Sequence, residues 1–218
     1  MVSIVSSEER KDSKSVWVGF NDAWVIEEVN QLNYLDIKRE RPALMTLFCR
    51  SKLDRNGQIA FKARITDIID SMYFGISCRS GDYYFDFLLS GAKEISAINT
   101  VHRTLVIGEV LSSNSQPLQK PVSIDTQWHD IRYSFSDTHV AIYFDSSEIK
   151  KIKLPFKPQE KINWGFGALY CNVGIKDLMI SDSGAETVPV TIHPDSILTI
   201  PVFKGMSIRS GSDRITGY

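Results

Sequence analysis

The feature of this 218-residue chain that most restricts its fold is a two-residue alternation of apolar and polar side chains between residues 128 and 180. Residues 131–135 place Ile, Tyr and Phe at alternate positions, and residues 140–144 do the same with Val, Ile and Phe after a short polar turn. Successive side chains of a β-strand point to opposite faces, so this pattern predicts a β-hairpin with one apolar face. Residues 164–170 and 175–180 add two further strands after a proline-bounded loop. The region is typical of an all-β sandwich.

The preceding part of the chain shows the same period. Residues 59–66 alternate Ile, Phe, Ala and Ile with Lys, Arg and Thr, which predicts a strand with one buried face and one solvent-exposed face. Residues 72–78 and 83–87 alternate in the same way on either side of Ser80-Gly81-Asp82, and they predict a second hairpin. Residues 43–50 predict a shorter strand.

Three segments are less regular. Residues 17–35 are compatible with a short helix around residues 22–32 or with irregular strands, and the two tryptophans here are expected to cap the core. The turn at Asp54-Arg55-Asn56-Gly57 contains an Asn-Gly pair, which readily takes positive φ. Residues 91–127 predict two strands, near residues 95–98 and 105–111. The Ser, Asn and Pro content of residues 112–121 predicts a loop.

The predicted organisation is one domain with two arms. Residues 1–15 are polar and form an N-terminal arm, residues 16–182 form the sandwich, and residues 183–218 form an extended C-terminal arm punctuated by Pro and Gly. The C-terminal arm either wraps its own sandwich or adds to a neighbouring subunit. In the second case the protein is a homo-oligomer or part of a larger assembly built through residues 183–218.

Composition excludes several partners. Lys and Arg number 25 and Asp and Glu 26, so the net charge gives no reason to expect nucleic acid or an anionic membrane. No apolar run approaches the roughly 20 residues of a membrane span, and the N-terminus does not resemble a signal peptide. We therefore expect a soluble chain that does not insert into a membrane. The sequence does not indicate its localisation, and association with a particle stays an alternative. Cys49, Cys78 and Cys171 are expected to be buried and unpaired.

Catalytic and metal-binding patterns are absent. Glycosidases that retain the configuration of the sugar need two carboxyl groups about 5–5.5 Å apart. A Glu-x-Asp-x-Glu motif on a strand supplies this distance. The sequence contains no such motif. The four histidines are scattered, without zinc spacing. We expect no catalytic residues, no metal site and no cofactor. Calcium stays open because several aspartates fall near predicted strand ends, where they also serve as turn residues: Asp67, Asp70, Asp125, Asp130 and Asp145.

Three stretches carry a resemblance to a known superfamily. Residues 61–89 contain a long hairpin, Trp128-His129-Asp130-Ile131 precedes a strand pair that ends near Asp145, and residues 162–180 form a Gly-rich strand followed by a Lys-Asp-Leu strand. The pattern resembles that of the concanavalin A-like lectin and glucanase superfamily, with laminin G-like modules as the nearest variant. The resemblance covers roughly residues 40–182 and implies an antiparallel two-sheet jelly-roll sandwich. The superfamily includes lectins, hydrolases, lyases, adhesion modules and virion proteins, so fold does not settle function.

One set of polar and aromatic side chains suggests a binding surface. If the apolar alternates face the core and these strands share a sheet, as the resemblance implies, the outer face combines aromatic rings with planar hydrogen-bonding groups, a combination suited to sugars. Its members are Arg64, Tyr73, Arg79, Tyr84, Asp86, Arg132, His139 and Tyr143. The alternative is an ordinary solvated face with cross-strand charge and aromatic pairs.

Three functions follow from these observations. The first is a non-enzymatic binding module for a glycan, glycoprotein or glycosylated surface. The second is a structural assembly protein, such as a virus or phage particle subunit, that uses the C-terminal arm for subunit contacts. The third is a glycoside hydrolase or lyase whose site the sequence does not display.

Overall fold

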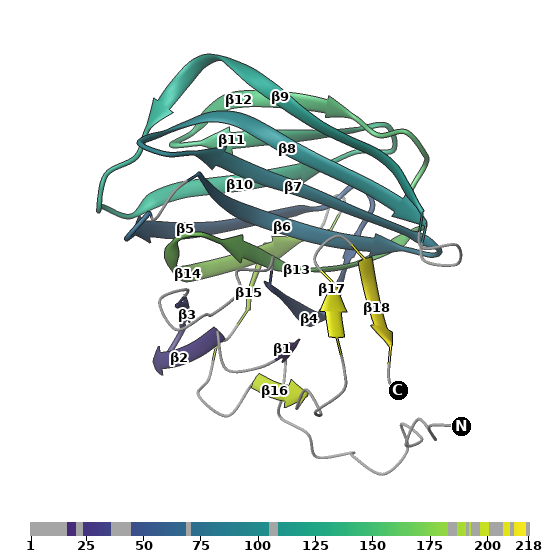
Figure 1. Cartoon of the computed structure of the whole chain (residues 1–218), viewed down its shortest axis with the longest axis horizontal. Helices are drawn as coiled ribbons and strands as arrows, with labels where there is room; N and C mark the ends of the chain where they lie inside the picture. The colour runs from purple at the N-terminus through teal and green to yellow at the C-terminus, as the bar shows by residue number, and fades with distance from the viewer. Residues whose placement is uncertain are drawn as a thin grey trace.

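Strands make up the regular structure of this protein. The computed structural model describes residues 17–20, 24–35, 45–68, 71–104, 109–182, 187–190, 192, 197–200, 207–209 and 212–216. Two sheets pack face to face, and the predicted all-β, two-sheet sandwich is confirmed (Figure 1). The predicted N-terminal arm, residues 1–15, lies outside the described residues.

The first sheet, sheet A, has the strand order β16-β1-β4-β13-β6-β7-β8-β9. Its strands are β1 (Trp17–Phe20), β4 (Met45–Asp54), β6 (Met72–Ser80), β7 (Tyr83–Gly91), β8 (Glu94–Thr104), β9 (Val110–Ser123), β13 (Lys161–Leu169) and β16 (Ile197–Ile200). All neighbours run antiparallel except β1 and β16, which are parallel.

The second sheet, sheet B, has the order β12-β11-β10-β5-β14-β3-β2, and β15 also pairs with β14. Its strands are β2 (Trp24–Glu28), β3 (Gln31–Tyr34), β5 (Gln58–Thr66), β10 (His129–Phe135), β11 (His139–Phe144), β12 (Ser147–Lys153), β14 (Asn172–Ser181) and β15 (Val188–Pro189). A separate two-stranded sheet joins β17 (Ser207–Arg209) to β18 (Ser212–Thr216).

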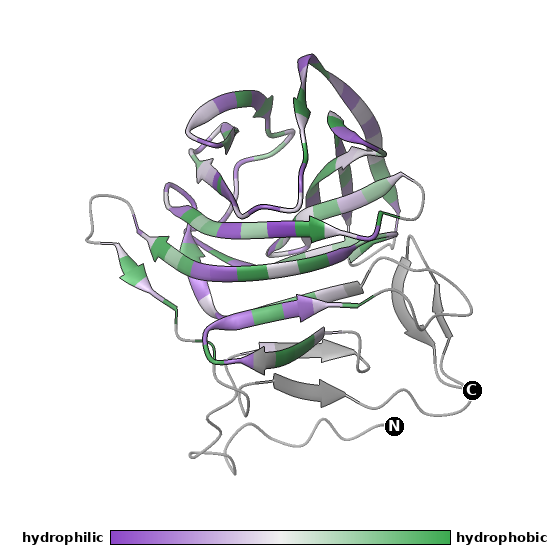
Figure 2. Cartoon of the chain, turned by 90° about the vertical axis from the view of Figure 1, so that its left-hand side faces the viewer, coloured by the Kyte–Doolittle hydropathy of each residue, from purple (hydrophilic) through white to green (hydrophobic). Residues whose placement is uncertain are grey.

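The core lies between the two sheets, where the alternating apolar residues meet. Along β10 and β11, Ile131 faces Phe144 and Tyr133 faces Ile142, and all four side chains are buried. Figure 2 shows the same alternation of hydrophobic and hydrophilic residues along strands of the sandwich. Both predicted hairpins, β6–β7 and β10–β11, are therefore confirmed.

Two irregular regions differ from expectation. Residues 17–35 form strands β1, β2 and β3, and their helical alternative is not observed. Trp17 and Trp24 are buried against the core, as predicted. Residues 112–121, predicted as a loop, belong to β9, so that prediction is wrong. β9 is an edge strand with mostly exposed side chains, and proline is tolerated at a sheet edge, so neither apolar alternation nor proline content identifies it.

The turn at residues 54–57 forms, but for a different reason than expected. The Gly57 amide donates to the Asp54 carbonyl oxygen at 2.8 Å, and neither Asn56 nor Gly57 has positive φ. A Cβ atom at position 57 would lie 2.6 Å from the Ser181 carbonyl oxygen. Glycine is needed here because β14 passes close to the turn.

Three described parts of the C-terminal region contact the sandwich, while β17 and β18 pair only with each other. Val188 pairs with Ile180, Ile192 is fully buried, and Ile197 pairs with Trp17. These contacts fit an arm that wraps its own sandwich. Assembly through residues 183–218 stays a prediction.

The three cysteines are free and buried, as predicted. Burial raises the pKa of Cys49 to about 11 and the pKa of Cys78 well above its ordinary value. Since the thiolate is the reactive form, we expect Cys49 and Cys78 to resist an aromatic disulfide reagent at neutral pH and to react once urea unfolds the chain. Thiol titration with and without urea measures this, and rapid native labelling of either residue would contradict it.

Candidate functional site

The eight side chains of the predicted binding surface divide between the two sheets. Arg64, Arg132, His139 and Tyr143 lie on β5, β10 and β11 of sheet B. The other four lie on β6 and β7 of sheet A: Tyr73, Arg79, Tyr84 and Asp86. The outer faces of the two sheets point away from each other, so the expectation of one shared surface is wrong.

Two of the sheet A residues are also buried. Tyr84 is 4% exposed and Asp86 is fully buried. Arg103 of β8 explains part of this burial: its Nη2 atom lies 3.5 Å from Asp86 Oδ2, and its guanidinium lies 4.5 Å from the centre of the Tyr84 ring. Tyr84 and Asp86 therefore belong to a buried polar cluster, and they are not accessible to a ligand in this structure.

Sheet B brings the remaining candidates onto one face. Cross-strand pairing aligns Tyr143, Arg132, Ala60 and Met179 across β11, β10, β5 and β14. The small side chain of Ala60 leaves a depression between its larger neighbours, a groove of about 290 Å³. Its lining residues are Ala60, Phe61, Lys62, Asp130, Ile131, Arg132, Tyr143, Ser146, Asp177 and Met179. His139, at the far end of β11, does not line this groove.

One wall of the groove is a stacked pair. The Arg132 guanidinium lies 4.0 Å from the centre of the Tyr143 ring, and the Tyr143 hydroxyl donates to Glu148 Oε2 at 3.1 Å. Such cation–π contacts contribute about 0.5–1 kcal/mol at exposed sites. The sequence also allowed an ordinary solvent-exposed face with cross-strand charge and aromatic pairs, and the Arg132–Tyr143 contact is a pair of that kind. The same contact places a flat ring and a planar hydrogen-bond donor at the groove.

The opposite wall carries charge. Asp177 Oδ2 lies 3.8 Å from Lys62 Nζ, and Asp177 has φ of 52° within an irregularity of β14. A bulge of this kind changes the direction of a side chain relative to a regular strand. It brings Asp177 to the groove, where the carboxylate adds an acceptor beside the Lys62 ammonium.

Trp128, which was not among the predicted site residues, packs against Arg64 and Lys176 of sheet B and does not line this groove. The Arg64 guanidinium lies 4.8 Å and the Lys176 Nζ atom 4.3 Å from the centre of the Trp128 ring. A Cβ atom on Gly174 would lie 3.1 Å from the edge of the indole, so the ring reaches across β5 to β14. A glycine between Val173 and Ile175, inside a strand, is the sequence signal for this close approach.

Asp130 and Asp145, near the groove, take part in contacts of the β11–β12 turn. Asp145 and Ser146 have φ of 46° and 68°, the values of a two-residue hairpin turn. His129 Nδ1 lies 2.8 Å from Asp145 Oδ2, and the Asp130 amide donates to Asp145 Oδ1 at 3.0 Å. Among the described residues no group of three or more potential metal ligands occurs, so the calcium alternative gains no support there.

Comparison with models of known protein families finds no match, and comparison with curated protein sequences finds none either. The fold, however, is similar to solved structures. The carbohydrate-binding module CBM66 from Bacillus subtilis has a TM-score of 0.54 at 8% identity, over 77% of this chain and 96% of that one. A Bacillus subtilis protein of unknown function with a galectin-like fold has a TM-score of 0.52 at 9% identity, over 79% and 89%.

A third similar structure comes from work on endo-acting O-glycanases with which members of the human gut microbiota initiate mucin breakdown. It has a TM-score of 0.52 at 14% identity and covers 82% of this chain and 96% of that one. At such identities the likeness shows a shared β-sandwich fold.

The described residues contain no helix with the length and hydropathy to cross a membrane.

Proposed function

We propose that this protein is a non-enzymatic binding module that recognises a glycan or a glycosylated surface through the outer face of sheet B. The observation that carries the proposal is the groove over Ala60, with the Arg132–Tyr143 pair on one wall and Lys62 and Asp177 on the other. Similarity to the sandwich of CBM66 supports it, as does the concanavalin A-like sequence pattern.

Binding would use the groups of the two walls without a covalent step. A sugar ring would pack against Tyr143 while the Arg132 guanidinium moves off the ring and donates to ring hydroxyls, at the cost of one cation–π contact. Asp130 and Asp177 would accept from other hydroxyls, and Lys62 would donate. Charge-assisted hydrogen bonds contribute about 1.5–3 kcal/mol each, which favours these contacts over neutral ones.

We expect the change Tyr143→Ala to weaken glycan binding by at least about tenfold, because truncating an aromatic anchor at a binding site typically costs about 2 kcal/mol. The ligand is first selected on a glycan array, and affinities are then measured by titration calorimetry. The matched control is Tyr73→Ala, which removes the same side chain from sheet A and should leave affinity within about twofold. Equal losses in the two variants, or no ligand on a broad array, would contradict the proposal.

Hydrolysis is the competing function for the same groove, since two carboxylates, Asp130 and Asp177, line it. Incubation of the selected glycan with the protein separates the two possibilities. The binding proposal expects the glycan to keep its length. Shortening that disappears in Asp130→Asn or Asp177→Asn would instead assign a glycosidase.

A further inference from the structure

A second and larger cleft lies between the edge strands of the two sheets. β9 ends sheet A and β12 ends sheet B, and the two strands lie near each other at the top of the sandwich (Figure 1). The cleft between them has a volume of about 830 Å³. Its walls are residues 119–123 of β9, residues 147–151 of β12, and the adjoining Phe144 and Asp145.

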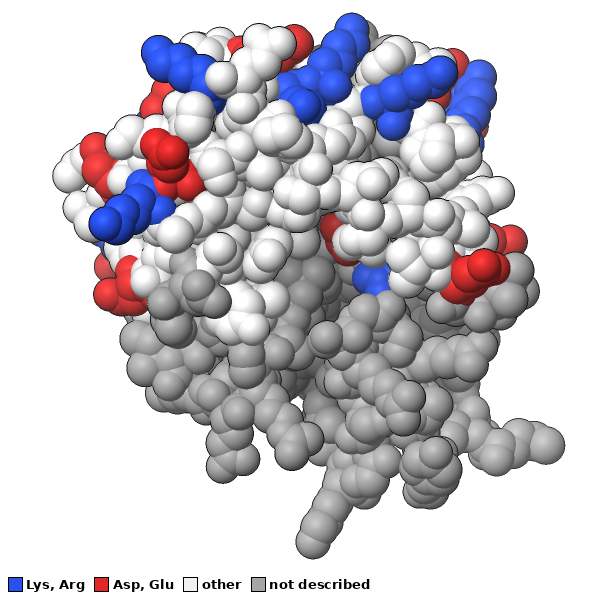
Figure 3. Space-filling view, turned by 45° about the horizontal axis from the view of Figure 1, so that its top comes forward, with Lys and Arg blue, Asp and Glu red and all other residues white. Residues whose placement is uncertain are grey.

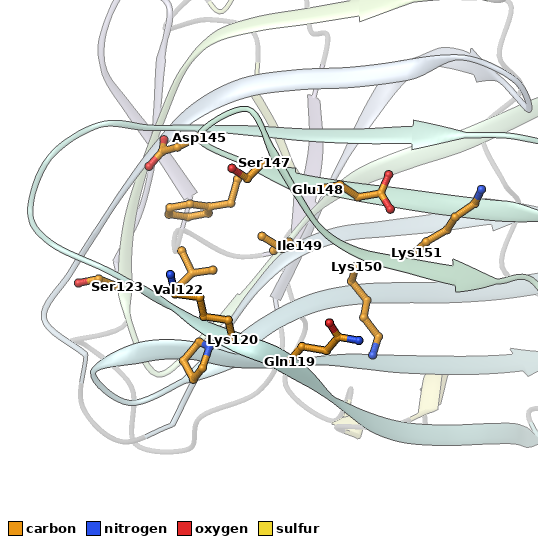
Figure 4. Close-up of a pocket in the computed structure, with 12 residues that line it drawn as sticks. Gln119, Lys120, Val122, Ser123, Asp145, Ser147, Glu148, Ile149, Lys150 and Lys151 are labelled. Carbon is orange, nitrogen blue, oxygen red and sulfur yellow. The ribbon is translucent and has the colours of Figure 1, made fainter.

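The cleft has an apolar base and polar rims. In Figure 4, Val122 of β9 and Ile149 of β12 lie across from each other, while the side chains of Gln119 and Lys150 reach toward one another from the two walls. The Lys150 Nζ atom donates to the Pro117 carbonyl oxygen at 3.0 Å, a bond that joins β12 to β9. The rims add hydroxyl groups from Ser123 and Ser147.

The charges of the cleft do not balance. Its two carboxylates already have partners: Asp145 accepts from the Asp130 amide and lies beside His129, and Glu148 accepts from the Tyr143 hydroxyl. Its three lysines are Lys120, Lys150 and Lys151. In the described part of the chain, no carboxylate lies within ion-pair distance of these three ammonium groups. Figure 3 shows Lys and Arg side chains along the upper edge of the view, with Asp and Glu side chains among them.

The edge strands are poorly suited to pairing with a peptide. β9 contains Pro117 and Pro121, which lack an amide hydrogen, and its pairing with β8 shifts register between Ala97 and Ile95. β12 contains a bulge at Ile149, where pairing with β11 shifts. Prolines and bulges interrupt the regular backbone ladder that an added strand requires. Recognition in this cleft therefore depends on side chains.

We propose that the β9–β12 cleft is a second binding site, one that takes an anionic polysaccharide carrying sulfate or carboxylate groups. Lys120, Lys150 and Lys151 would pair with the anionic groups, the amide of Gln119 and the serine hydroxyls would bond to sugar hydroxyls, and Val122 and Ile149 would contact the apolar face of a ring. The inference goes beyond the groove over Ala60 and stands without it.

The test uses the full chain with dextran sulfate and polygalacturonate as anionic probes, neutral dextran as the uncharged probe, and polyglutamate as the acidic peptide. We expect at least one anionic polysaccharide to bind about tenfold or more tightly than dextran and polyglutamate, and added salt to weaken this binding. The double change Lys120→Gln and Lys151→Gln should weaken it by about tenfold, since each exposed charge pair contributes up to about 1 kcal/mol. Lys150 is kept because it joins the two walls.

The matched control is Lys52→Gln with Lys93→Gln, which removes the same charge from two exposed lysines outside the cleft. It should leave the affinity within about twofold. Equal losses in both double variants, equal affinity for dextran, or equal affinity for polyglutamate would each overturn the proposal. Lys120 and Lys151 do not line the groove over Ala60, so the cleft proposal can fail while the groove proposal stands.

Discussion

Replacing Trp164 with alanine is expected to lower the free energy of unfolding by about 3–5 kcal/mol, the range for truncating a fully buried large aromatic side chain. Trp164 lies on β13 at the centre of sheet A and is fully buried. Its ring meets Trp17 and Phe166 edge to face, with ring centres 5.8 Å and 5.7 Å apart. Trp17 belongs to β1, so the truncation also removes part of the support for the N-terminal strand. Urea unfolding followed by far-ultraviolet circular dichroism measures the loss.

The conservative change Trp164→Phe provides the control. The Trp164 Nε1 atom has no hydrogen-bond partner among the residues that the structure describes, so phenylalanine removes no hydrogen bond there. We expect a loss below about 2 kcal/mol for this variant, which also keeps the test informative if Trp164→Ala does not fold. Equal stability of wild type and Trp164→Ala would mean that the site is not packed as described.

The second large effect is expected from Gly75→Ala on β6. A Cβ atom at this position would lie 2.1 Å from the Phe87 carbonyl oxygen and 2.8 Å from the Tyr133 hydroxyl. The first contact is with backbone of the neighbouring strand β7, so β6 and β7 would have to move apart. We expect a loss of about 3 kcal/mol in the free energy of unfolding, measured by the same urea titration.

Gly174→Ala is the matched control for Gly75→Ala. Its added Cβ atom would meet only side-chain ends at short distance, Trp128 at 3.1 Å and Asn33 at 3.4 Å, and these can shift. We expect a loss below about 1 kcal/mol. A similar loss in the two glycine variants would show that strand separation is not the cause.

Strands could be predicted from the sequence where apolar residues recur at every second position. In the β10–β11 hairpin one face is buried and the other is partly exposed, and a register shift by one residue would expose Ile131, Tyr133 and Phe135 together. β6 and β7 are largely buried on both faces, but their core-facing residues keep the two-residue period. β9 could not be predicted in this way. It lies at a sheet edge with most side chains in solvent, so its sequence carries no alternation.

The binding surface was only partly predictable, because sheet membership is a property of the whole fold. β5 and β6 follow one another in the sequence, yet they lie in different sheets, which separates Arg64 from Tyr73 and Arg79. Asp86 is buried beside Arg103, a residue from another strand. The groove itself depends on the alignment of Ala60 with Arg132 and Met179. This alignment is set by the register in which the strands pair, and the local sequence of each strand does not reveal it.

The pairing of β1 with β16 has a consequence for the order of folding. Trp17 and Ile197 lie far apart in the sequence, and few pairs among the described strands have a larger separation. Contacts between distant residues carry a high loop-closure entropy and tend to form late. During synthesis, the β1 edge of sheet A would lack its β16 neighbour until residues 197–200 have left the ribosome. A nascent chain stalled before residue 197 should therefore expose the β1 edge, the place where a chaperone or a second nascent chain would bind.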